Sequence, residues 1–342
     1  MIKMMIDPAL SPELAARALA QFPIQPARIQ PLRRSDNLTW RVETAEPKVY
    51  LLRVHQSLNA AMAGARQRPD CIQSELAWLI ALAESGSEVQ HPVQARNGSY
   101  VGQVEANGRL SPCTLLSWVE GELFDENRHN RPEVARSYGS LTARLHNHAA
   151  GWTPPKDFIR PAQDAAHFQR LFSEFRKGLQ WGLIQADDWP ILSEACAQAV
   201  SDMERFEALP GQWGLIHADL HVGNILVRGA RVLPIDFSLC GWGSYLFDLS
   251  IALLGGLPTA LRASFLEGYR ALRPLAADLL PCVEIYGLVG VLSYCSFQIE
   301  NPENHEWLVA RIPRLVSGEC KRYLTGEPVY ALAKSLDPSN LY

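Results

Sequence analysis

Hydrophobic and polar residues alternate along much of the first third of the chain, as they do in β-strands with one buried face. Residues 38–43 and 49–55 alternate in this way and are rich in β-branched and aromatic residues, and 29–33, 100–105 and 113–119 are also strand-like. Two other segments, from Ser11 or Pro12 to about residue 22 and from about 71 to 85, follow the helical period of about 3.6 residues. We therefore predict an antiparallel sheet of about five strands with accompanying helices.

The pattern becomes mainly helical after Gly121. Long helical segments are expected at 132–148, around 164–180 and at 188–208, and helices dominate again from after residue 237 to about residue 324. The most apolar run, 285–297, is shorter than a membrane span and predicts a core helix. We expect an α+β fold of two lobes, residues 1–119 and 120–342, joined by a short crossing strand at about 119–121.

One loop between predicted strands carries a dense set of polar side chains. Residues 214–237 read GLIHADLHVGNILVRGARVLPIDF, with apolar strands at 225–227 and 232–235. Along this stretch His217, Asp219, Asn224 and Asp236 follow one another in an order that bears on the chemistry. A glycine-containing turn between the last two strands predicts a hairpin, which would bring Asp236 back beside Asn224.

This order of residues is typical of enzymes that move a phosphoryl group from ATP to a hydroxyl. Such a reaction needs a carboxylate to orient the hydroxyl, for which Asp219 is the candidate. It also needs oxygen ligands for magnesium, for which Asn224 and Asp236 are the candidates. A zinc or iron site built on His217, Asp219 and His221 is the alternative, but the remaining histidines are scattered along the chain.

Further motifs stand before and after this loop. They are Leu-Arg-Val at 52–54, Ser-Glu-Leu-Ala-Trp-Leu at 74–79, Leu-Leu-Ser-Trp-Val-Glu-Gly at 115–121, Leu-His at 145–146 and Phe-Asp-Leu at 247–249. In this order they resemble the aminoglycoside phosphotransferase and choline kinase superfamily, a branch of the protein-kinase-like fold. The resemblance covers about residues 32–255 and is closest to the bacterial homoserine kinase and stress-response kinase branches. It implies a small nucleotide-binding N-terminal lobe and a larger, mainly helical C-terminal lobe for catalysis and acceptor binding.

The resemblance also implies which residues bind the cofactors ATP and Mg²⁺. Arg53 corresponds to a cation on the third strand of the family, and Glu75 to its partner on the following helix. The alternative for these two residues is a pair of solvated surface charges. The Trp118 carbonyl and the Val119 amide are expected to bind the adenine edge.

Two residues are implied to support the catalytic loop. His217, which we group with Asp219 as catalytic, would brace the loop against the Asp-Phe segment that begins at Asp236. Asp248 would accept backbone amides of the loop from the next helix. His221 lies inside the loop, and its role does not follow from the sequence.

The turn between the first two strands departs from protein kinases. No glycine occurs before Gly64, so the Gly-x-Gly-x-x-Gly loop is absent. Ser35, Asp36 and Asn37 must form the turn instead, and these residue types tolerate unusual backbone angles. We expect Ser35 and Asn37 to contact phosphate; a plain surface turn is the alternative.

Composition narrows the range of partners. At 342 residues and 47% hydrophobic content the chain can build a sizeable core, and a net charge of −4 without a basic stripe argues against nucleic acid. The seven cysteines are spread out and read as reduced thiols of a cytoplasmic protein. The N-terminal segment is interrupted too early for a signal peptide. We expect a cytoplasmic enzyme without a membrane partner, and leave its oligomeric state open.

The phosphate acceptor is expected to be a small molecule with a hydroxyl group, such as an amino alcohol, a sugar or an aminoglycoside-like compound. Glu300, Glu303 and Glu306, at 298–306, are either a binding site for a polyamine or a solvated helix face. A protein Ser/Thr kinase of the bacterial stress-response type is one alternative, weakened by the lack of a long activation segment. A catalytically silent nucleotide-binding regulator is the other.

Overall fold

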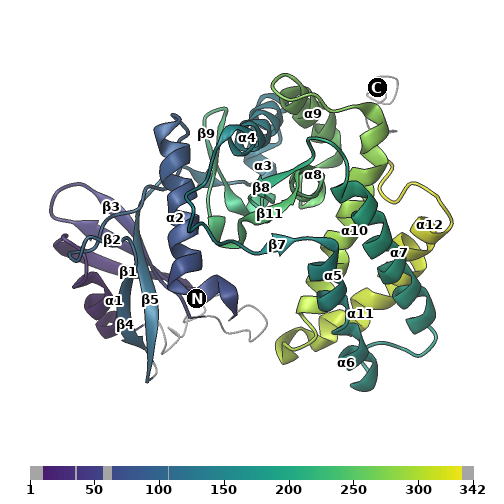
Figure 1. Cartoon of the computed structure of the whole chain (residues 1–342), viewed down its shortest axis with the longest axis horizontal. Helices are drawn as coiled ribbons and strands as arrows, with labels where there is room; N and C mark the ends of the chain where they lie inside the picture. Colours follow the sequence, from purple (N-terminus) through teal and green to yellow (C-terminus); the bar gives the residue numbers. More distant parts are fainter. Residues whose placement is uncertain (1–10, 35–36, 57–63, 107, 333–342) are drawn as a thin grey trace. The chain divides into compact units, whose positions relative to one another are not determined.

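The computed structural model describes residues 11–34, 37–56, 64–106 and 108–332, and these form two compact units (Figure 1). Unit 1 consists of the described residues up to Glu120 together with Thr153–Pro161. Unit 2 consists of Gly121–Trp152 and of the described residues from Ala162 onwards. The chain therefore passes from one unit to the other three times, where a division at residue 119 would need only one passage.

Unit 1 is built on the antiparallel five-stranded sheet that the alternating pattern predicts. The strand order is β1-β2-β3-β5-β4, and every neighbouring pair is antiparallel. The strands are β1 (Pro26–Arg34), β2 (Leu38–Thr44), β3 (Val49–Val54), β4 (Gly102–Ala106) and β5 (Arg109–Ser117). Two helices accompany them, α1 (Pro12–Leu19) and α2 (Pro69–Glu84). The predicted sheet and both predicted helices are confirmed.

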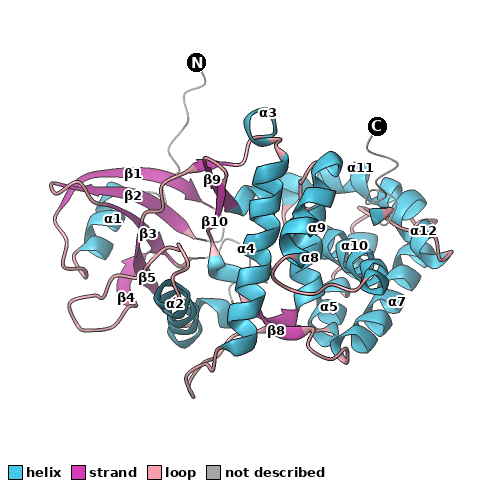
Figure 2. Ribbon diagram, turned by 90° about the horizontal axis from the view of Figure 1, so that it is seen from above, coloured by secondary structure: helices cyan, strands magenta, loops and turns pink. Residues whose placement is uncertain are grey.

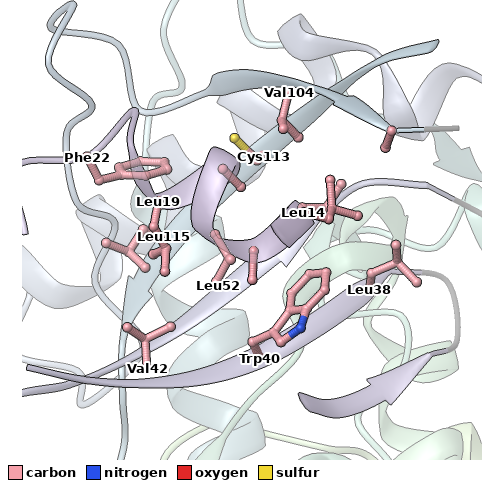
Figure 3. Packing of buried hydrophobic residues seen from close by; sticks show 14 of the residues in the cluster. Leu14, Leu19, Phe22, Leu38, Trp40, Val42, Leu52, Val104, Cys113 and Leu115 are labelled. Atoms are coloured by element: carbon pink, nitrogen blue, oxygen red, sulfur yellow. The ribbon is translucent and has the colours of Figure 1, made fainter. Parts of the chain in front are cut away.

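Helix α1 closes the core of unit 1. Its start is fixed by Ser11, whose hydroxyl accepts a hydrogen bond from the Leu14 amide at 3.1 Å, and by a proline at the first helical position. The apolar side chains of the helix pack on inward-facing strand residues such as Trp40 and Leu52 (Figure 3). Burial of this apolar surface is the main stabilising contribution to the unit.

Unit 2 is mainly helical (Figure 2). Its helices are α3 (Glu126–His129), α4 (Pro132–Gly151), α5 (Ala165–Phe172), α6 (Phe175–Gln180), α7 (Trp189–Glu207), α8 (Tyr245–Leu254), α9 (Arg262–Arg270), α10 (Leu280–Phe297), α11 (His305–Leu315) and α12 (Lys321–Leu324). Helices α4 and α9 approach closely because glycines face each other's backbone: a Cβ at Gly139 would lie 1.8 Å from the Phe265 carbonyl oxygen, and one at Gly268 would lie 1.9 Å from that of Arg136.

Two small sheets of unit 2 hold the loop that carries the polar residues. One has the order β10-β9-β6 and the other β7-β11-β8. Their strands are β6 (Glu122–Leu123), β7 (Ala162–Gln163), β8 (Trp213–Ile216), β9 (Ile225–Arg228), β10 (Arg231–Pro234) and β11 (Gly241–Ser244). The predicted hairpin is therefore present as β9 and β10, and the loop leaves β8 and enters β9.

Two local predictions were wrong. Strand β5 ends at Ser117, so the segment at 118–121 is not a crossing strand. Residues 298–306 are not one helix face, because α10 ends at Phe297 and α11 begins at His305. Within this stretch Glu300 pairs with Lys177 at 2.7 Å, which explains its charge without a ligand.

The C-terminal part of unit 2 is anchored on helix α10. The carboxylate of Glu284, which is buried, accepts hydrogen bonds from the amides of Tyr330, Ala331 and Leu332 at 2.7, 3.1 and 2.7 Å. The segment Ala277–Phe297, which includes α10, is long and apolar enough to cross a membrane by length and composition alone. Its mean hydropathy is 1.5, but 56% of the window is buried inside the protein, as expected for the predicted core helix.

Candidate active site

The loop between β8 and β9 is held by a buried carboxylate on the helix that follows. Asp248 on helix α8 is fully buried and accepts the amide of His217 at 2.9 Å and the amide of Ala218 at 2.8 Å. The backbone of Ala218 has a φ of 66°, in the left-handed region that residues with a side chain seldom adopt. Two hydrogen bonds to a charged group are strong enough to hold this conformation. The predicted role of Asp248 is confirmed.

A buried histidine supports this carboxylate in turn. His146 on α4 lies with Nε2 3.3 Å from Asp248 and with Nδ1 2.9 Å from the hydroxyl of Tyr269. Burial lowers the pKa of His146 although Asp248 opposes the shift. Burial alone would raise the pKa of Asp248, but the hydrogen bond from His146 and the amide of His217 leave that pKa below its ordinary value. A neutral histidine beside an ionised aspartate follows.

His217 connects the loop to the segment that follows β10. Its Nδ1 accepts the Asp219 amide at 3.3 Å, so Nε2 carries the proton and donates to the Ile235 carbonyl at 3.1 Å. Its ring also packs on that of Phe237, with centroids 4.5 Å apart. These contacts are those of a brace between the loop and the Asp-Phe segment.

Asp219 and Asn224 form a hydrogen-bonded pair on the loop. The side-chain amide of Asn224 donates to the Asp219 carbonyl at 2.9 Å and to the Asp219 carboxylate at 2.7 Å. Both partners are acceptors, which assigns the nitrogen of the Asn224 amide to this side and leaves Oδ1 facing elsewhere. The Asp219 side chain remains 34% exposed, so its carboxylate is accessible from solvent.

Asp236 follows the second strand of the hairpin. The Ile235 amide donates to the Asn224 carbonyl at 3.0 Å, so the backbone next to Asp236 is tied to that of Asn224. Asp236 itself has a φ of 63°, and its Oδ1 accepts the Ser238 hydroxyl at 2.7 Å. The predicted closeness of these two segments is therefore seen in their backbones.

The donor set of this loop suits a hard cation. Within the described part of the chain, Asn224 Oδ1 and Asp236 Oδ2 take part in no hydrogen bond, which leaves one amide and one carboxylate oxygen available. Magnesium is typically bound by one or two protein carboxylates, with water and phosphate oxygens completing the octahedron. No group of three or more His, Cys, Asp and Glu side chains suited to a metal occurs among the described residues. Asn224 and Asp236 therefore fit magnesium.

His221 also lies close to Asp219. Its Nδ1 accepts the Gly223 amide at 2.9 Å, which places the remaining ring nitrogen 3.7 Å from Asp219 Oδ1. The sequence left the role of this residue open. The structure places it beside the loop carboxylate, at a distance too long for a direct hydrogen bond.

In unit 1 the predicted cation and carboxylate are paired. Arg53 on β3 donates to Glu75 on α2 at 2.6 Å, and their side chains are only 4% and 2% exposed. The alternative of two solvated surface charges is therefore wrong. Because a buried charge is costly without its partner, removal of either residue should be strongly destabilising.

The remaining candidates of unit 1 are partly described. Asn37 is buried at the start of β2, and Ser35 lies outside the described residues. The Trp118 amide donates to the Val49 carbonyl at 3.0 Å. Within the described ranges the Trp118 carbonyl and the Val119 amide take part in no hydrogen bond, so both groups are available to a ligand.

Sequence reasoning missed several groups that support the loop. The hydroxyl of Tyr138 on α4 donates to the Leu220 carbonyl, and Ser238 binds Asp236. His146 belongs to the Leu-His motif at 145–146, but its contact with Asp248 could not be inferred from the motif. These partners are far apart along the chain and carry no spacing signal; only the fold brings them together.

Comparison with known proteins agrees with this geometry. The model of the phosphotransferase enzyme family matches residues 28–279. An amicoumacin kinase of Bacillus subtilis strain 168 is 22% identical over 263 residues, which cover 75% of this chain and 73% of that protein. A homoserine kinase of Methylobacillus flagellatus is 30% identical over 213 residues, and the alignment spans 58% of each protein. The solved structure of a microcompartment-associated aminopropanol kinase is 25% identical, with a TM-score of 0.75, and covers 93% of this chain and 98% of that one.

The fold and the loop define a phosphotransferase of the protein-kinase-like class. The family match covers well over half of the chain, and the protein belongs to the phosphotransferase enzyme family. It is an ATP-dependent enzyme that phosphorylates a hydroxyl group of a small molecule.

Proposed function

We propose that this enzyme transfers the γ-phosphoryl group of Mg-ATP to the hydroxyl of an amino alcohol in the cytoplasm. The observation that carries the proposal is the Asp219–Asn224 pair, which is held by Asp248 and followed across the hairpin by Asp236. It supplies the three groups that phosphoryl transfer requires of a protein: a carboxylate for the acceptor hydroxyl and two oxygen ligands for the cation.

In the proposed mechanism Asp219 accepts a hydrogen bond from the acceptor hydroxyl, aligns it with the phosphorus atom and takes its proton late. Asn224 keeps the Asp219 carboxylate oriented through the 2.7 Å hydrogen bond and, with Asp236, holds Mg²⁺. An ion held by these two residues would supply neutralisation of the charge on the phosphate oxygens. His217 keeps the loop against the Asp236 segment.

The nucleotide would be bound mainly by the lobe at 1–119. Arg53, aimed by Glu75, binds phosphate oxygens in this proposal, and the turn residues Ser35 and Asn37 contact phosphate through their polar groups. The Trp118 carbonyl and the Val119 amide bind the adenine edge. The lobe at 120–342 would then supply catalysis and the acceptor site.

An amino alcohol is the acceptor class that similar proteins favour. Their names include homoserine kinase and aminopropanol kinase, and homoserine and aminopropanol each carry an amine and a hydroxyl group. A net charge of −4 supports a small-molecule partner over nucleic acid, and free, mostly buried cysteines support the cytoplasm. We propose no membrane partner for the enzyme.

The test is acceptor-dependent ADP release from Mg-ATP by the full chain, with homoserine, aminopropanol, a hexose and an aminoglycoside as added compounds. We expect release with the amino alcohols and a phosphomonoester product in ³¹P NMR spectra. The Asp219→Asn variant, which preserves size and shape, is the matched control and should bind ATP but turn over about 10² to 10⁴-fold more slowly. Phosphate on protein serine would instead favour the protein kinase, and tight ATP binding without any turnover would favour the silent regulator.

A further inference from the structure

A short segment of the chain returns to unit 1 and contacts the helix that carries Glu75. This segment, Thr153–Pro161, follows helix α4 and is called the strap below. Its Ile159 amide donates to the Ser74 hydroxyl at 2.8 Å. Its Arg160 guanidinium donates to the Cys71 carbonyl at 3.2 Å and lies 3.4 Å from the Cys71 sulfur. The strap is thus bonded to helix α2 at two positions one turn apart.

These contacts are buried, so water does not readily replace them. Arg160 is 5% exposed and Ser74 is 4% exposed. The Ser74 hydroxyl is used in both directions, since it accepts from Ile159 and donates to the Asp70 carbonyl at 3.0 Å. A buried donor or acceptor that loses its partner is costly, which makes the position of the strap on α2 specific.

Ser74 and Glu75 are consecutive residues of α2, about 100° apart around the helix axis. Ser74 contacts the strap, and Glu75 contacts Arg53 on the sheet. Both side chains are buried, so the helix is fixed on two faces at the same level. A rotation or shift of α2 that moves Glu75 away from Arg53 would also break the bond between Ser74 and Ile159.

The strap itself has little freedom. Three of its nine residues are prolines, and the Phe158 amide closes a turn on the Pro155 carbonyl at 3.0 Å. Only Pro161 separates Arg160 from Ala162, which begins β7 and pairs with Trp242 of β11. A segment that is stiff and anchored close to each end can hold α2 at little further entropic cost.

We propose that the strap holds helix α2 in the position that keeps Glu75 on Arg53, and that Ser74 and Arg160 are positioning residues for nucleotide binding. The proposal rests on the proposed role of Arg53 in binding phosphate. In this proposal Ser74 and Arg160 act through the Arg53–Glu75 pair and not through direct contact with a substrate. The strap thereby connects the nucleotide-binding residues of unit 1, through the chain itself, to the sheet that precedes the catalytic loop.

The first measurement is the effect of Ser74→Ala and of Arg160→Gln on the kinetic constants. We expect each variant to raise KM for ATP and to lower kcat/KM for ATP by about tenfold or more, because misplacement by about 1 Å can cost about 10²-fold. KM for the acceptor should not change. Ser74→Thr, which retains the hydroxyl, and Arg160→Lys, which retains a donor, should restore most of the loss.

Matched controls lie on the same two elements. Ser85→Ala removes a hydroxyl from the end of α2 that bonds Leu82 and not the strap, and Lys156→Gln removes an exposed charge of the strap. Both should leave the kinetic constants unchanged. A purely structural role of Ser74 would lower Tm and leave KM for ATP unaltered well below that temperature, which would overturn the proposal. Should Ser74→Ala fail to fold, Arg160→Gln and its rescue by Arg160→Lys carry the same test.

A double-mutant cycle with Glu75→Gln separates this inference from the proposed function. If the strap acts through the pair, Ser74→Ala should reduce kcat/KM for ATP by less than about twofold once Glu75 is replaced. Equal losses in both backgrounds would overturn the strap proposal alone. If Glu75→Gln and Arg53→Ala leave ATP kinetics unchanged, the role of the pair fails and the strap proposal fails with it.

Discussion

Unit 2 contains two aspartates that serve the same loop in opposite ways. Asp248 is fully buried and receives three hydrogen-bond donors, two backbone amides and His146. Asp219 is 34% exposed and lies at the open end of the loop, beside Asn224 and His221. The region around Asp248 is inaccessible to solvent, and we expect it to contribute strongly to the free energy of unfolding. The second region is accessible to solvent, and we expect it to contribute little to the free energy of unfolding.

The fold therefore assigns the rigid support of the loop and the accessible carboxylate to two different aspartates. A carboxylate that must receive a proton needs an accessible oxygen, whereas one that fixes backbone needs its oxygens fully used. The strained conformation of Ala218 lies between the two regions, and the frame of Asp248 supplies the energy that maintains it. Substitutions in the two regions should therefore have opposite profiles of activity and stability.

The largest effect is expected for Asp219→Asn. Removal of the general base should lower kcat by about 10² to 10⁴-fold, because proton acceptance contributes about that factor. ATP affinity and Tm should stay close to those of the wild type, since the amide keeps the shape of the carboxylate. Steady-state kinetics, nucleotide titration and calorimetry measure the three quantities. A normal kcat would remove Asp219 from the chemistry.

Asp248→Ala should show the reverse profile. It leaves two buried amides without an acceptor, at a cost of roughly 1–3 kcal/mol each in the free energy of unfolding. Activity should then fall through loss of the loop conformation, with a clear loss in urea midpoint. Wild-type stability of the variant would show that the loop does not depend on the hydrogen bonds to Asp248.

A smaller effect is expected from the ionisation of His146. Its pKa in the folded protein is lowered by burial, so below the unfolded pKa of about 6.5 the unfolded state binds more protons. Stability should be complete above that pH and decrease as the pH falls below it, by up to about 1.4 kcal/mol per unit for one proton. Urea titrations between neutral and mildly acidic pH measure the slope. His146→Gln should flatten the curve, and an unchanged slope would assign it to another group.

The smallest effect is expected for Tyr138→Phe. The variant removes one hydrogen bond to the Leu220 carbonyl, worth about 0.5–1.5 kcal/mol, and preserves packing against Phe265. Tm should fall slightly. The change in kcat should be smaller, by orders of magnitude, than the change caused by Asp219→Asn. A loss of kcat as large as that of Asp219→Asn would make Tyr138 part of the chemistry.

Local pattern was sufficient for the parts of the fold with regular periods. Strands β1 to β5, helices α1 and α2 and the hairpin of β9 and β10 follow from alternation, helical spacing and a glycine turn. Strand β11 could not be found in this way, because Gly241–Ser244 contains two glycines and one large apolar residue, and only its pairing with β8 defines it. The strap was missed for the same reason: contacts with α2 span 85 and 89 positions of sequence.

In the candidate site, too, some residues could be predicted from the sequence and others could not. Residue type and order make His217, Asp219, Asn224 and Asp236 the candidates, because the chemistry restricts which side chains can serve. The Arg53–Glu75 pair was also expected, and its burial is what the structure adds. The acidic residues at 298–306 were misinterpreted because a charge pattern does not reveal partners: Lys177, which pairs with Glu300, lies on helix α6.

The hydrogen bonds that Glu284 accepts from the last described residues limit how far the chain can be shortened. Cutting the chain ahead of Tyr330 would remove all three amides that donate to this buried carboxylate. Anyone trimming the protein for crystallisation, or fusing a tag to its end, should keep everything up to Leu332 and attach beyond it.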